Sequence, residues 1–123
     1  MNPALIIDTN ERGSLVSAVE RRAKSRSPRI DISREKLVNG DYKCGDWLIE
    51  AKSIDDLFNS MRSGHLMRQL DNMDANDGNY GLVIWGDIGG YIHRAHERGS
   101  KISASQALKQ MTGFLGRVVA DFG

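Results

Sequence analysis

Apolar residues in this chain form several short runs that are rich in strand-forming residues and are bounded by turn residues. Such runs at residues 4–7, 47–52 and 80–85 predict β-strands, and partial alternation within 29–38 predicts another. Two turns that contain glycine, Asn39-Gly40 and Cys44-Gly45-Asp46, stand on either side of a short segment that precedes Trp47. We therefore expect an antiparallel hairpin that ends in the strand at 47–52.

Other apolar residues recur every three or four positions, which predicts helices. One helix is expected over 14–24. A longer stripe over 54–73 passes Gly64 and predicts either one bent helix or two abutting helices, and a last stripe ends at Phe122. A serine can cap the start of each of these helices, because its hydroxyl oxygen can accept a hydrogen bond from a backbone N–H group of the first turn. The candidate caps are Ser14, Ser53, and either Ser103 or Ser105.

Two segments show no clear period. Residues 76–79 are expected to form a loop, and residues 88–103, with the adjacent glycines Gly89 and Gly90, a mobile loop. The resulting order is strand, helix, hairpin, helix, strand, helix. This order predicts an α/β fold with a mixed central β-sheet flanked by α-helices.

Length and composition fit one domain over residues 1–123 with a sizeable core. The last helix ends where an α/β pattern would place another strand, so we expect the natural protein to continue past Gly123. The single cysteine, Cys44, favours a reducing, intracellular setting. The sequence shows no leader and no apolar run of about 18 residues, so a membrane location is not expected.

A formal net charge of +1 conceals local asymmetry. Basic residues gather at 21–29 and again at 93–101, while acidic residues gather between these runs. Basic flanks around an acidic middle suit a polyanion held beside a metal site. For any one of these runs taken alone, an ordinary solvated surface is the better explanation.

The acidic residues gather around the strand at 47–52. Glu50 and Lys52 are two residues apart and share one face of an extended strand. Ile49 and Ala51 then point into the core. Asp41, delivered from the neighbouring strand, would bring a second carboxylate to this place. Two carboxylates and a lysine at a strand end can hold a hard cation and activate water.

Three further acids stand at element boundaries: Asp8 and Glu11 after the first strand, and Asp56 at the start of a helix. An isolated Glu-x-Lys triplet is a weak signal, but convergent acids repel one another and require a compensating cation. An acid in the first turn of a helix also has a purely structural explanation, which applies to Asp56.

The order of these residues resembles the restriction-endonuclease-like nucleases and, more narrowly, the XPF/Hef-type structure-specific endonuclease domain. That family's strand ending Asp-x-Arg-Glu, its Gly-Asp, its Glu-Arg-Lys and the following Asp all have counterparts in this chain. Three family arginines are replaced, by Asn10, Ala51 and His65. The matching residues are Asp8, Glu11, Gly40-Asp41, Glu50-Ala51-Lys52, Asp56-Leu57, Ser60, Gly64-His65-Leu66 and Gln69.

The resemblance implies a restriction-endonuclease-like core and a DNA endonuclease that depends on Mg²⁺ or Mn²⁺ and cuts branched, flap or junction DNA. It implies catalytic roles for Asp8, Glu11, Asp41, Glu50 and Lys52. The implied metal ligands are Asp8, Asp41, Glu50 and the Ala51 carbonyl. The expected DNA contacts are Arg12, Arg62, His65 and Arg68, with Asp56 and Gln69 in support. A homodimer or a partner subunit is also expected, because relatives commonly use a helix-hairpin-helix module that does not follow here.

The sequence leaves two other functions to consider. One is a catalytically silent DNA-binding scaffold that pairs with an active nuclease, although retention of Asp41, Glu50 and Lys52 argues against it. The other is a small-molecule phosphatase. That activity would need an Asp-x-Asp strand end or a glycine-rich phosphate loop, and the sequence has neither.

Overall fold

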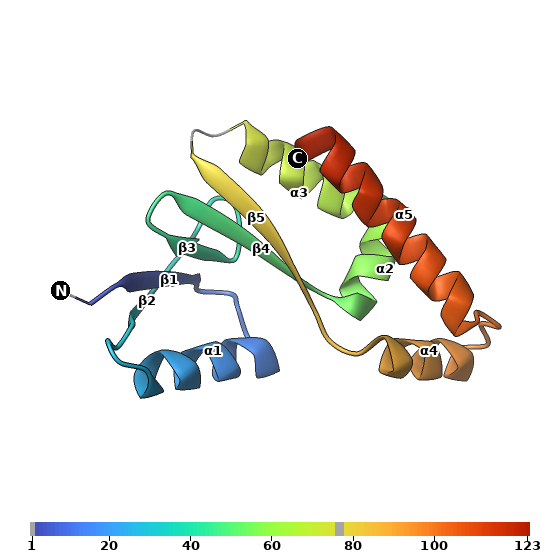
Figure 1. Ribbon diagram of the computed structural model, residues 1–123, viewed down its shortest axis with the longest axis horizontal. Helices are drawn as coiled ribbons and strands as arrows, with labels where there is room; N and C mark the ends of the chain where they lie inside the picture. The colour runs from blue at the N-terminus through green and yellow to red at the C-terminus, as the bar shows by residue number, and fades with distance from the viewer. Residues whose placement is uncertain (1, 76–77) are drawn as a thin grey trace. The chain divides into compact units, whose positions relative to one another are not determined.

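The computed structural model describes residues 2–75 and 78–123 (Figure 1). Within this part of the chain, no helix has both the length and the apolar character needed to cross a membrane. The elements, in chain order, are β1 (Ala4–Asp8), α1 (Ser14–Ser25), β2 (Asp31–Glu35), β3 (Tyr42–Cys44), β4 (Trp47–Ser53), α2 (Ile54–Ser63), α3 (His65–Asp74), β5 (Asn79–Trp85), α4 (Ile88–Glu97) and α5 (Ala104–Phe122).

The chain packs as two compact units. The first, the sheet unit, comprises 1–51 and 75–83, and the second, the helical unit, comprises 52–74 and 84–123. All five strands contribute to the sheet unit, and the last residues of β4 and β5 belong to the helical unit. A single domain over 1–123 stays a prediction.

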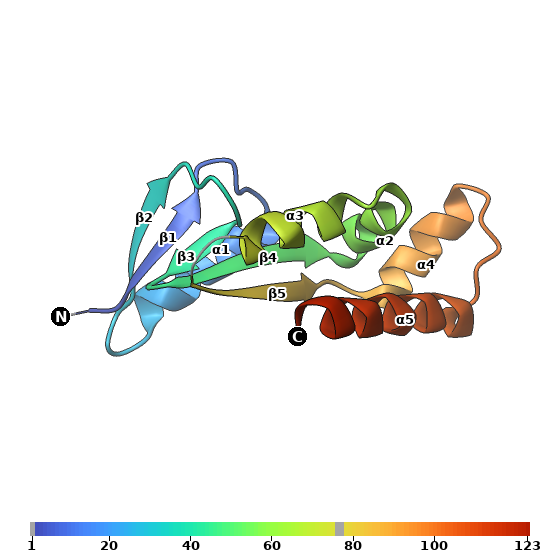
Figure 2. The same ribbon diagram turned by 90° about the horizontal axis from the view of Figure 1, so that it is seen from above.

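The strands form one mixed sheet in the order β2-β1-β3-β4-β5, as Figure 2 shows. β1 pairs in parallel with β2 and antiparallel with β3, and β3 pairs antiparallel with β4. The predicted hairpin is confirmed: Tyr42 lies opposite Ile49, and Cys44 lies opposite Trp47. This mixed sheet with flanking helices confirms the predicted α/β class.

One face of the sheet is covered by α1. Ile7, Val16 and Tyr42 are buried together, and the side chains of Ile49 and Ala51 pack against them. Since neighbouring strand residues point to opposite faces, Glu50 lies on the other face, as predicted. The cap predicted for this helix is wrong. Ser14 is already helical, and the N-cap is a glycine without a side-chain bond.

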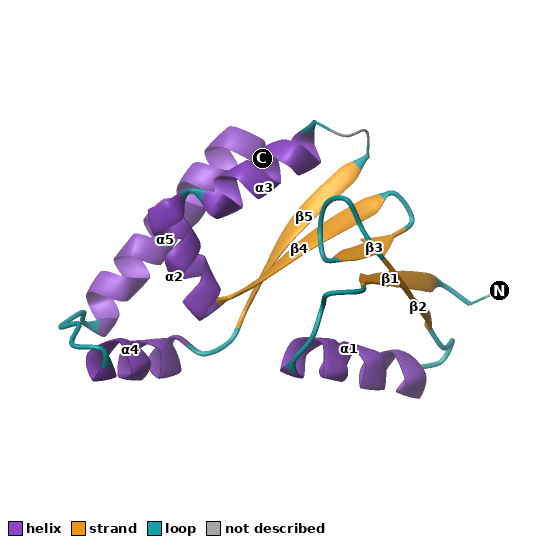
Figure 3. Cartoon of the chain, turned by 180° about the vertical axis from the view of Figure 1, so that it is seen from behind, coloured by secondary structure: helices purple, strands orange, loops and turns teal. Residues whose placement is uncertain are grey.

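The helical unit contains α2 to α5, which Figure 3 shows in purple. The stripe predicted over 54–73 forms two helices, because Gly64 adopts a left-handed conformation (φ 72°) that ends α2. Ser53 caps α2 as predicted by accepting a bond from the Asp56 N–H (3.1 Å). The apolar stripe is buried, and its most enclosed residues are Leu57, Leu66, Leu70 and Met73.

Helix α5 begins as predicted at the Ser103 cap. The Ser103 hydroxyl accepts a bond from the Gln106 N–H, and the Gln106 side chain accepts one from the Ser103 N–H. This reciprocal pair is a capping box, and it settles the choice between Ser103 and Ser105.

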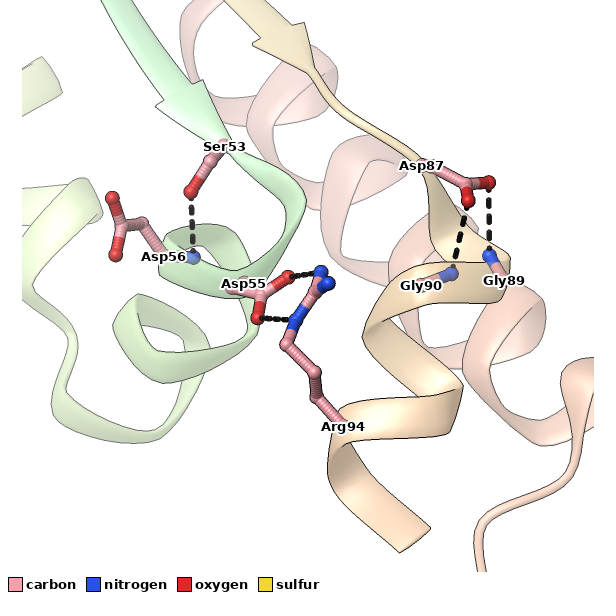
Figure 4. A network of polar contacts seen from close by, with 7 residues as sticks. All are labelled: Ser53, Asp55, Asp56, Asp87, Gly89, Gly90 and Arg94. Atoms are coloured by element: carbon pink, nitrogen blue, oxygen red, sulfur yellow. Dashed lines mark hydrogen bonds and ion pairs between the residues drawn. The ribbon is translucent and has the colours of Figure 1, made fainter. Parts of the chain in front are cut away.

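The prediction of a mobile loop over 88–103 is wrong, since residues Ile88–Glu97 form α4. The Asp87 carboxylate accepts bonds from the N–H groups of Gly89 and Gly90 (both 3.1 Å), so the two glycines occupy a capped first turn (Figure 4). Tyr91 and Ala95 are buried beside Phe58 of α2, whose ring stacks on Tyr91 with centroids 4.1 Å apart. In the loop predicted at 76–79, residues 76–77 lie outside the described residues, and Asn79 begins β5.

A bidentate ion pair also joins α4 to the start of α2. Arg94 donates to both carboxylate oxygens of Asp55, at 2.6 and 2.7 Å (Figure 4). These bonds from Arg94 hold the pKa of Asp55 below its ordinary value. The pair thus helps to fix the first turn of α2, which directly follows β4.

Candidate functional site

The predicted acidic site is organised around Asp41, at the start of the hairpin. Gly40 precedes it with φ 79°, and a Cβ there would lie 3.3 Å from the Ile49 carbonyl oxygen. Glycine is therefore favoured by both backbone conformation and space. The Asp41 N–H donates to the Ile49 carbonyl (2.8 Å), and one Asp41 carboxylate oxygen accepts from the Ala51 N–H (2.8 Å). Asp41 is thus tied at two points to the strand that carries Glu50.

Asp8 ends β1 beside Asp41. Its N–H donates to the Asp41 carbonyl at 2.9 Å. One oxygen of the Asp8 carboxylate accepts from the Leu37 N–H (2.8 Å) and the other from the Asn10 N–H (3.1 Å). In this structure, both oxygens of Asp8 therefore hold the backbone of the loops around the site.

Glu11 lies in the loop between β1 and α1, with its side chain hydrogen-bonded to that of Asp41. The pKa of Glu11 is raised from its ordinary 4.5 to about 7. Partial burial is the largest cause, followed by the charge of Asp41, their hydrogen bond and the charge of Asp8, while Arg34 acts in the opposite direction. A carboxyl pair that favours a shared proton is also a pair whose repulsion a cation would relieve.

Glu50 and Lys52 occupy alternate positions of β4. The side chain of Glu50 is 2% exposed, which is unusual for a carboxylate. Ile49 and Ala51 pack against the α1-covered core, so alternation places Glu50 and Lys52 on the opposite face of the strand. The predicted face of this Glu-Ala-Lys triplet is confirmed, and the chemical role of each residue stays a prediction.

Two residues that sequence reasoning missed support the site. Arg34 of β2 donates to the carbonyls of Asp8 (3.0 Å) and Glu11 (2.8 Å), and to the Glu20 carboxylate (2.9 Å). It therefore holds the loop that carries both acids. The partial alternation of apolar and polar residues around Arg34 indicated only a strand. Its partners are distant in sequence, so no local pattern could have indicated them.

The second missed residue is Tyr42, next to Asp41. Its side chain is 6% exposed, and its hydroxyl has no hydrogen-bond partner among the described residues. Burial, and then the charges of Glu11 and Asp41, raise the pKa of Tyr42 to about 12. The phenol is therefore neutral throughout the physiological range. An aromatic residue directly after the acid is the one sequence signal that could have indicated it.

The remaining predicted residues are spread over both units. Arg12 is exposed in the loop after Glu11, in the sheet unit. The other three expected DNA contacts belong to the helical unit and flank the junction of α2 and α3: Arg62, His65 and Arg68. The Arg68 guanidinium donates to the Ser63 carbonyl (3.1 Å), where it supports the end of α2.

The two supporting residues have clear structural positions. Asp56 lies in the first turn of α2, where its N–H is capped by Ser53 and its negative charge favours the helix start. Gln69 is half-buried on α3. Their contribution to a site stays a prediction.

The acids offer only oxygen ligands, which are the ligands that Mg²⁺ and Mn²⁺ prefer. The hydrogen-bonded pair Glu11 and Asp41 fits such a cation by charge and chemistry. Among the described residues, however, no three His, Cys, Asp or Glu side chains are grouped closely enough to hold a metal ion. The structure thus brings Asp8, Glu11 and Asp41 to one place without showing a formed metal site.

The chain matches the model of the ERCC4 domain over residues 7–113 and belongs to this family. This match confirms the resemblance to the XPF-type nuclease domain that the sequence motifs indicated.

Solved structures with the same fold include XPF from Aeropyrum pernix, with a TM-score of 0.57 and 21% identity over 69% of this chain and 41% of that chain. XPF from the same organism in complex with DNA is also similar, with a TM-score of 0.61 and 20% identity over 90% of this chain and 50% of that chain. The chain thus spans at most half the length of these two proteins. No curated protein matches it.

Proposed function

We propose that this domain is a DNA endonuclease that depends on Mg²⁺ or Mn²⁺ and hydrolyses phosphodiester bonds in branched, flap or junction DNA during repair or recombination. The observation that carries the proposal is the position of Asp41, whose carboxylate is tied to the Glu50-Ala51-Lys52 strand and hydrogen-bonded to Glu11. ERCC4 domains are generally nucleases, and one protein with the same fold is described in complex with DNA.

In this proposal, Asp41, Glu50 and the Ala51 carbonyl hold the cation, and Asp8 contributes directly or through water. The bound cation would supply Lewis-acid stabilisation and a more acidic water. Glu11 completes the acidic pocket and loses its proton when the cation binds. Lys52 orients the attacking water or helps to deprotonate it, and it stabilises the negative charge that develops on phosphorus.

The test uses labelled flap, fork, four-way junction and plain duplex DNA, each with Mg²⁺, with Mn²⁺ and with a chelator. We expect cleavage of a branched substrate only when a metal is present. Asp41→Asn keeps the acceptor for the Ala51 N–H but removes a charge, and Lys52→Ala removes the proposed water-orienting group. Both variants should lose cleavage, while the exposed control Asp31→Asn should retain it. Unchanged turnover in either site variant contradicts the assignment.

A catalytically silent DNA-binding scaffold is the second candidate. It is favoured by Asp8, both of whose carboxylate oxygens accept backbone N–H bonds, and by the lack of a three-ligand cluster among the described residues. The same experiment separates the two functions. Binding of branched DNA without cleavage in either metal supports the scaffold.

The proposal includes a homodimer or a partner subunit. Two large apolar side chains on one side of α5 are exposed, Leu108 by 45% and Val119 by 68%, and such residues favour an interface when they cluster. Light scattering after size-exclusion chromatography should show a dimer that Val119→Glu weakens. A monomer at all concentrations contradicts the homodimer. An intracellular location also stays a prediction.

A further inference from the structure

Two adjoining hollows in the helical unit lie between α2 and α5. The first has a volume of about 500 Å³ and extends to the connection between α4 and α5, and the second has a volume of about 410 Å³ and extends along α5. Both are lined by Arg62 of α2 and Gln110 of α5, so the two hollows adjoin at these residues. Gln110, Gly113 and Arg117 follow helical spacing, which places them on one face of α5.

Positive charge gathers at these hollows, which we call the basic groove and define by its five cations. The groove has no acidic lining residue among those that the structure describes, and each of the five cations is exposed. They are Arg62, Arg98, Lys101, Lys109 and Arg117. The contrast with Arg94 is informative, because that arginine is neutralised by Asp55 and does not line the groove.

This charge reflects the sequence of the whole C-terminal segment. Residues 98–123 contain four Lys or Arg residues and one acid, Asp121. All four cations line the groove, together with Arg62. Cations that line a groove without an acidic lining residue are suited to a polyanion, and their attraction for it should fall as salt is added.

The groove also offers apolar and aromatic surface. Its second hollow is lined by Phe58, Met61 and Phe114, and Phe114 is half-buried. Gly113 beside it has nothing within 4 Å of the position that a Cβ would take, so the surface there is open. Cations for a backbone beside an aromatic face for bases are the combination that binds single-stranded nucleic acid.

We propose that the basic groove, which lies wholly within the helical unit, binds single-stranded DNA. The inference rests on the proposed function in taking DNA as the ligand. The cations contact successive phosphates, and Phe114 stacks on an unpaired base. The side of α5 that carries Leu108 and Val119 is about half a turn away from Gln110, so an interface there leaves the groove accessible.

A single strand fits the groove better than a duplex does. In a duplex the bases are paired and stacked, so Phe114 and Met61 would face sugar and phosphate, and the apolar part of the groove would gain nothing. An acidic protein could satisfy the cations and the polar lining, but its carboxylates offer no planar base to stack on Phe114.

The test is fluorescence anisotropy of a labelled short oligo(dT) and of a duplex of equal length, with the full chain in a chelator so that no cleavage occurs. The double variant Arg62→Gln/Arg117→Gln should weaken oligo(dT) binding and reduce the slope of log affinity against log salt by about 1.4, about 0.7 for each cation. Phe114→Ala should weaken oligo(dT) binding by about 5- to 100-fold. Lys36→Gln removes an exposed cation outside the groove and should change neither quantity.

The charge variant alters only exposed side chains, so it tests the proposal even if Phe114→Ala fails to fold. Equal oligo(dT) binding by the wild type and the double variant overturns the proposal. An equal loss of duplex and oligo(dT) binding in Phe114→Ala overturns the single-strand assignment. Cleavage by the wild type together with an unaffected double variant would refute the groove and leave the nuclease standing. Groove-dependent binding without cleavage in any metal would refute the nuclease and leave the groove standing.

Discussion

Replacing Glu11 by glutamine should make the domain more stable at neutral pH when no divalent cation is present. Glu11 has a pKa of about 7 in the folded chain against an ordinary 4.5, so the folded state holds its proton more tightly than the unfolded state does. Its stabilising contribution is complete below the unfolded pKa and is lost as pH rises through about 7. Glu11→Gln keeps the neutral form at every pH and avoids that loss.

The magnitude follows from the two pKa values. A difference of about 2.5 corresponds to at most about 3 kcal/mol in the free energy of unfolding. Glu11 is only partly buried, and solvent screening reduces this figure to about 1–2 kcal/mol. The difference in free energy of unfolding between the variant and the wild type should therefore grow as the pH rises from about 5 to about 8. It should reach about 1–2 kcal/mol in favour of the variant.

Urea unfolding followed by circular dichroism, in a chelator and at several pH values over this range, measures the effect. Glu35→Gln is the matched control, because Glu35 is an exposed acid at the end of the neighbouring strand. Its stability should follow that of the wild type. Parallel curves for the wild type and Glu11→Gln would refute the reasoning. Saturating Mg²⁺ at about pH 8 should stabilise the wild type more than Glu11→Gln, since only the wild type carries the negative charge of Glu11 beside the proposed ligands.

Three further changes test the fold that positions the site, each by urea unfolding. Leu66→Ala removes a side chain with 0% exposure and should cost about 2–5 kcal/mol, whereas Leu66→Met should cost less than about 1.5 kcal/mol. Ser103→Ala removes the capping-box hydroxyl of α5 and should cost about 1 kcal/mol, while Ser105→Ala, which caps nothing, should cost less than half of that. Gly40→Ala strains a backbone with φ 79° and crowds the Ile49 carbonyl, so it should cost about 1–2 kcal/mol and also weaken cleavage; an unchanged free energy of unfolding would contradict the account of the turn before Asp41.

The sequence predicted most of what depends on local spacing. The two-residue period around Glu50 placed its side chain on the face opposite Ala51. A hydroxyl directly before an apolar stripe marked the cap at Ser53, and the cap of the last helix was narrowed to Ser103 or Ser105. The same reasoning failed at α4, because two adjacent glycines suggested a loop. The Asp87 side chain compensates for those glycines by capping their N–H groups.

Long-range features of the candidate site could not be predicted. Arg34 was missed because its three acceptors lie in other elements, and Asp8 gave no sign that both of its carboxylate oxygens would bind backbone N–H groups. The division into two units is likewise invisible in the pattern, since β4 and β5 each run from one unit into the other without a break.

The bond between the Asp41 carboxylate and the Ala51 N–H has a consequence for how this motif can change over evolutionary time. Every residue except proline offers the same N–H, so the grip on Asp41 does not depend on which side chain stands at position 51. The side chain at position 51 can therefore change while Asp41 keeps its position, as the replacement of the family's arginine by alanine illustrates. A saturation library at position 51 should accordingly tolerate many small residues and reject proline.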